Sequence, residues 1–138
     1  MEHPKRLHFK TFIMILIMVL AGPLGNVLLG KGMKQMGQVH LWPPAELLHA
    51  FTRIITSPTI WLGIVSQLVF FAAYMIVLSW ADYSYVQPAS SIAYAVVALL
   101  ASTWLGEFVP ATRWLGIAVI CIGVLLVGHT HPSTTENG

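Results

Sequence analysis

Four long apolar segments follow one another in this chain and constrain its fold more than any other feature. They cover residues 11–30, 60–80, 83–105 and 111–128. A helix needs about 20 residues to cross a hydrocarbon core of roughly 30 Å, and it satisfies its own backbone hydrogen bonds there. Tryptophans fall at the ends of these segments, where indole prefers the boundary between lipid and water. We therefore predict an all-α integral membrane protein with four transmembrane helices.

The connection between the first and second segments is less apolar and predicts a short additional helix. A Trp-Pro-Pro sequence at 42–44 indicates a turn into this helix, with Glu46 in its first turn and Arg53 in its last. Apolar residues then recur at helical spacing between positions 47 and 55. The short helix is expected to be amphipathic, and either to lie in the membrane interface or to pack on the rest of the protein.

Composition agrees with a single membrane domain and excludes several other classes. Hydrophobic residues make up 57% of the chain and charged residues 9%, and the formal net charge of +2 is too small to indicate a nucleic-acid partner. We divide the chain into a basic N-terminal segment (1–10), a four-helix transmembrane domain (11–128) and a polar C-terminal tail (129–138). The lipid bilayer is the first expected partner.

No catalytic constellation is visible, so an enzyme is not expected. No Asp, Glu, Lys, Arg or His lies in the middle of an apolar segment, which removes the usual proton-coupling carboxylate. The single cysteine, Cys121, can form no intrachain disulfide and reads as a small buried hydrophobe. No metal-ligand cluster or phosphate-binding glycine loop is present, and we predict neither cofactor nor metal.

Polar residues in the third segment form a stripe. Four of them follow the spacing i, i+3, i+4 and i+7, which is one face of a helix. These groups would be unsatisfied in hydrocarbon, so they should face the interior, where Asn26 and Gln67 could meet them. The stripe either lines a solute cavity or only holds the bundle together by interhelical hydrogen bonds. The candidate substrate-binding residues are Asn26, Gln67, Gln87, Ser90, Ser91 and Tyr94.

Two further pairs of residues are candidates for binding. Lys31 and Lys34 share a helix face at the end of the first segment, and they either extend to the membrane surface as anchors or bind an anionic headgroup. Gly116 and Gly123 give the fourth segment a smooth stripe, which favours close packing against a second subunit and hence a homodimer.

Positive charge does not decide the orientation of the chain. Three basic residues precede the first segment, and four lie on the opposite side. The basic cluster at the start and the even number of spans favour both termini in the cytoplasm. An antiparallel dimer remains an alternative.

At these residues the sequence resembles the drug/metabolite transporter superfamily, in particular its half-length members with four helices. The resemblance covers about residues 26–128 and depends on the order of several short motifs. They are Ser-Pro at 57–58, Tyr-Val-Gln-Pro-Ala at 85–89, Leu-Gly-Glu at 105–107, and Trp-Leu-Gly-Ile-Ala-Val-Ile-Cys-Ile-Gly-Val at 114–124. Within the superfamily the chain looks like EamA-type proteins, the small multidrug resistance exporters, and the small subunits proposed to flip aminoarabinose linked to undecaprenyl phosphate.

The resemblance implies a multi-pass protein of the bacterial inner membrane that works as a dimer. The multidrug exporters carry a glutamate in their first helix, and the matching position here is Gly22, so proton-coupled export of cationic drugs is not expected. Their fourth-helix glycine motif, used for dimerisation, matches Gly116 and Gly123, and their third-helix substrate site matches Tyr94. The expected function is alternating-access transport of a small organic solute. The alternatives are a flippase for a lipid-linked sugar or another lipid, and a non-transporting subunit of a membrane complex.

Overall fold

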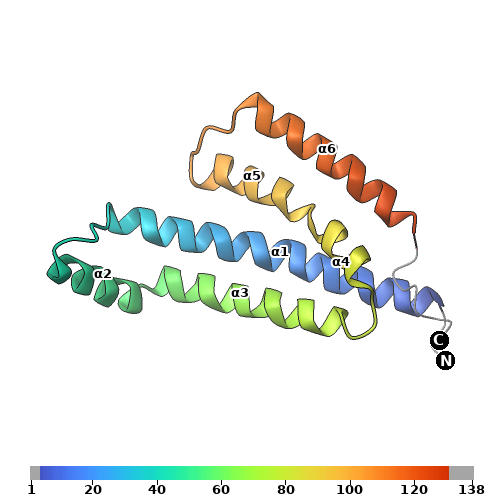
Figure 1. The fold of residues 1–138 in the computed structure, drawn as a ribbon, viewed down its shortest axis with the longest axis horizontal. Coiled ribbons are helices and arrows are strands. Elements are labelled where there is room, and N and C mark those ends of the chain that lie inside the picture. Colours follow the sequence, from blue (N-terminus) through green and yellow to red (C-terminus); the bar gives the residue numbers. More distant parts are fainter. Residues whose placement is uncertain (1–3, 131–138) are drawn as a thin grey trace.

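The computed structural model describes residues 4–130, which are helical apart from short connections and contain no β-strand (Figure 1). Residues 1–3 and 131–138 lie outside the described part, and with them most of the predicted C-terminal tail. The helices, in chain order, are α1 (Pro4–Met36), α2 (Pro44–Thr56), α3 (Pro58–Val77), α4 (Tyr83–Ser90), α5 (Ala93–Trp104) and α6 (Ala111–Gly128).

Four segments are long and apolar enough to cross a membrane, which confirms that part of the predicted fold class. They are α1, α3, the combined segment Tyr83–Trp104, and α6. The short helix α2 is also present, and it buries no residue on the rest of the described chain. Its apolar side chains, among them Leu48 and Phe51, are exposed. Residues 4–10, predicted as a separate basic segment, form the first turns of α1.

The centre of the fold is the antiparallel pair of α1 and α3, which lie side by side along most of α3 (Figure 1). Glycines permit this close approach. A Cβ atom added to Gly63 would lie 2.8 Å from Cγ of Leu29 and 3.0 Å from its backbone nitrogen. A Cβ on Gly25 would lie 3.0 Å from the backbone oxygen of Gly63. The backbones of α1 and α3 therefore approach so closely that only glycine fits at these positions.

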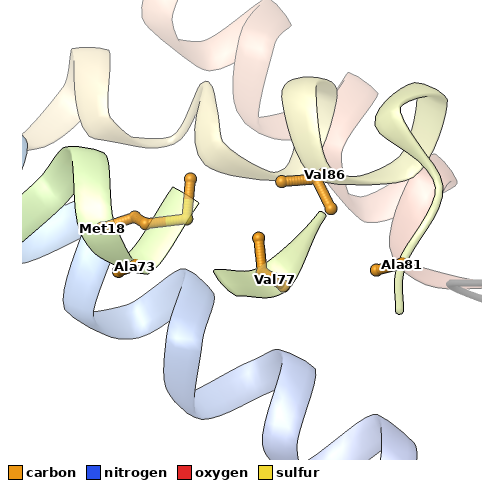
Figure 2. Close-up of a cluster of buried hydrophobic side chains, with 5 residues drawn as sticks. All are labelled: Met18, Ala73, Val77, Ala81 and Val86. Atoms are coloured by element: carbon orange, nitrogen blue, oxygen red, sulfur yellow. The ribbon is translucent and has the colours of Figure 1, made fainter. Parts of the chain in front are cut away.

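A small apolar core closes one end of this pair. Figure 2 shows Met18 of α1 near Ala73 and Val77 of α3, with Ala81 in the following link and Val86 of α4 beside them. All five side chains are buried. This cluster fixes α4 against the α1 and α3 pair.

The third apolar segment is not the continuous helix that its hydropathy predicts. It breaks at Ser91 and Ile92 into α4 and α5. Pro88 has no backbone N–H to donate, and the hydroxyl groups of Ser90 and Ser91 donate to the backbone oxygens of Gln87 and Pro88. Such side-chain bonds compete with the helical ladder and bend helices. The stripe of polar residues therefore lies across a helix break.

The outermost helix is α6, which contains no buried residue (Figure 1). It contacts α4 and α5, and its Gly116 and Gly123 have open space where a Cβ would stand. The glycine stripe therefore makes no close helix contact within the described chain.

Trp80, in the link after α3, anchors that link to α1, and its replacement tests this packing. Its Nε1 donates to the hydroxyl oxygen of Thr11 at 3.0 Å, and Thr11 is 1% exposed. Trp80→Phe should lower the free energy of unfolding by about 1–3 kcal/mol, because it leaves the buried hydroxyl without this donor. Thermal unfolding in detergent measures the change. Trp114→Phe on the exposed face of α6 is the control, and equal losses in both variants would contradict the anchoring role.

Candidate functional site

A cavity of about 210 Å³ lies between α1, α3 and the junction of α4 with α5. It is lined by polar side chains from all of these helices. The structure brings every residue that the sequence predicted for substrate binding to this one cavity: Asn26, Gln67, Gln87, Ser90, Ser91 and Tyr94.

The cavity lies near the middle of the apolar segments that form it. Gln67 is the tenth of the 20 residues of α3, so about 15 Å of helix extends on either side of it. Tyr94 occupies a similar position between the ends of the segment Tyr83–Trp104. If these segments span a bilayer, the polar groups lie near its midplane.

Asn26 and Gln67 are hydrogen-bonded across the interface of α1 and α3. Nε2 of Gln67 donates to Oδ1 of Asn26 at 2.7 Å. The Oε1 atom of Gln67 is buried and has no hydrogen-bond partner among the described residues. A buried acceptor without a donor costs free energy in the folded chain.

Gln87 and Ser90 of α4 and Ser91 just after it differ in what they offer the cavity. The hydroxyl groups of Ser90 and Ser91 donate to backbone oxygens of their own helix, which leaves their oxygen lone pairs as acceptors. The Oε1 atom of Gln87 accepts from the hydroxyl of Tyr74 at 3.4 Å, a long bond. Structural bonds therefore occupy the serine protons but leave acceptor capacity in the cavity.

Tyr94 stands on the open side of the cavity. Its side chain is 64% exposed, and Asn26 is exposed as well. The wall of the cavity is consequently incomplete in a single chain. A second body placed against this side would close it.

Sequence reasoning missed the apolar and small residues of the site. Gly22, Pro23 and Phe70 also line the cavity, and Phe70 stacks on Tyr74 with ring centroids 6.2 Å apart. A Cβ on Gly22 would lie 3.1 Å from the Phe70 ring. The position of Phe70 depends on the register between α1 and α3, so no local sequence signal could have identified it.

The two predicted lysines lie away from the cavity and are already engaged. Nζ of Lys34 forms an ion pair with the carboxylate of Glu107, which precedes α6. Nζ of Lys31 lies over the ring of Trp104 at 5.2 Å from its centroid, a cation–π contact. Lys34 therefore links the end of α1 to the connection between α5 and α6, and Lys31 links it to the end of α5.

None of the residues lining the cavity is charged. Among the described residues there is also no group of three or more His, Cys, Asp and Glu side chains that could hold a metal ion. The chemistry that this site offers is hydrogen bonding by neutral groups beside two aromatic rings.

Comparison with known proteins leaves the family of the chain as an expectation from its motifs. No protein-family model, no curated protein sequence and no solved structure matches it. The resemblance to the drug/metabolite transporter superfamily therefore stays a prediction.

Proposed function

We propose that this chain is a membrane transporter subunit that moves a small organic solute through its cavity by alternating access. The observation that carries the proposal is a neutral, polar cavity at the middle of segments long and apolar enough to span a bilayer. The proposal includes the expected location in a bacterial inner membrane with both termini in the cytoplasm. The exposed apolar face of α2 would lie in the membrane interface.

The energetics of polar groups support a transport role over a purely structural one. A bundle held by interhelical hydrogen bonds should satisfy its buried polar atoms, because an unsatisfied group in a membrane costs several kcal/mol. Here Oε1 of Gln67 is buried without a partner, and the hydroxyl of Tyr94 extends from an exposed side chain. A change of conformation that exposed Oε1 would let a ligand satisfy it, beside the hydroxyl of Tyr94.

The helix break beside the cavity supports the same proposal. Discontinuous helices are a common way for transporters to place binding groups near the membrane midplane. The break between α4 and α5 lies at Ser91, which lines the cavity. A change of angle at this break would alter access to the cavity from one side.

A homodimer is part of the proposal. The cavity is open on the side of Tyr94, and the glycine stripe of α6 is free of close contacts within the described chain. Packing a second copy through Gly116 and Gly123 would bury the glycine stripe of α6. Because no carboxylate lines the cavity, transport is expected to follow the solute gradient and not to exchange solute for protons.

A flippase for a lipid-linked sugar has weaker support. An anionic headgroup at Lys34 would have to displace Glu107, and Lys31 already lies on Trp104. The cavity volume of about 210 Å³ also falls below the roughly 300–1,000 Å³ of sites that bury a drug-sized ligand, and a lipid-linked sugar is larger still. A small solute fits these dimensions better.

Binding of a solute should be visible as a rise in melting temperature. A ligand that binds only the folded state stabilises it by about 2.7 kcal/mol at a hundredfold excess over Kd. We expect stabilisation of the detergent-purified protein by members of a panel of small polar metabolites and organic cations. A second panel of polyprenyl phosphates and phospholipid headgroups tests the flippase alternative.

Matched variants decide which site is responsible for a rise in melting temperature. Tyr94→Phe removes a cavity hydroxyl, whereas Tyr83→Phe removes one at the start of α4, where the side chain is also exposed. Loss of the solute shift in the Tyr94 variant alone supports the proposal. Stabilisation only by the lipid panel, lost on replacing Lys31 and Lys34, would instead support a flippase. A rise in melting temperature that none of these substitutions changes would contradict both the solute site and the flippase site.

A further inference from the structure

A second, larger groove lies on the opposite side of the α4 and α5 junction from the polar cavity. It has a volume of about 430 Å³ and is formed by the N-terminal half of α1, by α4, and by the C-terminal end of α6. Its walls are mostly apolar, with Phe12, Ile15 and Val19 from α1 and Val124 and Leu125 from α6. The proposed transport mechanism does not use this groove.

Basic residues precede the groove-lining residues of α1 along the same helix. Lys5, His8, Phe12, Ile15 and Val19 follow helical spacing, so the apolar wall of α1 continues directly into a basic turn. Lys5 lies seven residues before Phe12, about 10 Å along the helix axis. Arg6 follows it, and both side chains are exposed.

The same end of the groove is bounded by the end of α6. Gly128 and His129 line it together with Phe12, so the start of α1 and the end of α6 lie at one end of the molecule (Figure 1). The acidic residue described at this end is Asp82, in the link between α3 and α4. Three basic residues of α1 lie at the same end, namely Lys5, Arg6 and Lys10, so positive side chains outnumber this one carboxylate among the described residues there.

We propose that this groove binds one acyl chain of an anionic phospholipid, with the lipid phosphate at Lys5 and Arg6. The apolar walls match the acyl chain, and the cations match the phosphate at the depth where headgroups begin. A second copy of the chain fits less well, because a parallel two-fold contact through this face would bring the same cations together. The inference rests on the proposed placement in a membrane but not on transport.

Native mass spectrometry of the full chain, released from detergent with equimolar phosphatidylglycerol and phosphatidylcholine, tests the proposal. We expect preferential retention of phosphatidylglycerol. The double variant Lys5→Gln with Arg6→Gln should lower the preference by roughly fivefold for each cation, the equivalent of about 1 kcal/mol. The control is Arg53→Gln with Arg113→Gln, which removes the same charge from exposed positions of α2 and the start of α6 and should leave the preference unchanged.

A second variant tests the apolar part of the site. Gly128 lines the groove and a Cβ there meets no atom within 4 Å, so Gly128→Leu adds a side chain at the groove wall where its first carbon has room. It should lower the retention of both lipids. Ala118→Leu adds bulk to an exposed position of α6 outside the groove and should not.

Three results would overturn the lipid site. The first is equal retention of the two lipids by the unmodified chain. The second is a loss of lipid preference in the control double variant as large as the loss in Lys5→Gln with Arg6→Gln. The third is a change in the monomer to dimer ratio of Gly128→Leu without loss of bound lipid. The last result would make the groove a protein interface. None of them affects the solute-induced shift in melting temperature, so failure here and failure of the transport proposal are distinguishable.

Discussion

Replacing Gln67 by leucine should abolish solute binding and transport and also destabilise the protein. The variant removes the buried Oε1 atom that lacks a partner and leaves Oδ1 of Asn26 without its donor at 2.7 Å. An unsatisfied polar group of this kind costs about 1–3 kcal/mol of unfolding free energy. Melting temperature and uptake into proteoliposomes measure the two effects.

The double variant Asn26→Leu with Gln67→Leu separates binding from folding. Removing both partners of a hydrogen bond is often nearly neutral for stability, so the double variant should regain much of the unfolding free energy that the single variant loses. It should not regain solute binding, because the cavity then lacks both amides. If the double variant transports as well as the unmodified chain, the two amides serve only to hold α1 and α3 together.

Replacing Gly63 by alanine should destabilise the fold. The added methyl group would lie 2.8 Å from Cγ of Leu29 and 3.0 Å from its backbone nitrogen, and the backbone cannot move as a side chain can. Overpacking of this kind costs about 1–3 kcal/mol. Because α1 and α3 also form two walls of the cavity, we expect loss of the solute-induced shift together with a lower melting temperature.

Gly123→Ala is the matched control, since a Cβ there meets nothing within 4 Å in the single chain. It should leave the melting temperature of the monomer unchanged and weaken the proposed dimer. Cross-linking in membranes reports the dimer. Similar destabilisation of the monomer by both substitutions would show that the close approach of α1 and α3 does not limit stability.

The local parts of the fold follow from the sequence. Apolar segments of the right length gave four segments that can span a bilayer, and a proline turn with amphipathic spacing gave α2 starting at Pro44. The polar spacing at 87, 90, 91 and 94 placed these residues on one side of the third segment, and all of them line the cavity. Each of these features depends on residues close in the chain.

The third segment shows where local reasoning was insufficient. Its mean hydropathy predicts one helix over 83–105, but Pro88 and the two serine side chains divide it into α4 and α5. A proline within an apolar helix is often tolerated in membranes, so the sequence did not decide between a kink and a break.

Sequence alone determined which residues are apolar, which segments are helical, and that no charged group lies in their middle. Tertiary structure decided which of these residues meet at the cavity, because those contacts depend on the register between α1 and α3. That register brings Asn26 to Gln67 and Phe70 to Gly22, and it leaves one amide oxygen buried without a partner. It is set by glycines that let two backbones touch, and such a contact joins residues some 40 positions apart in the chain, as the Asn26 and Gln67 pair does.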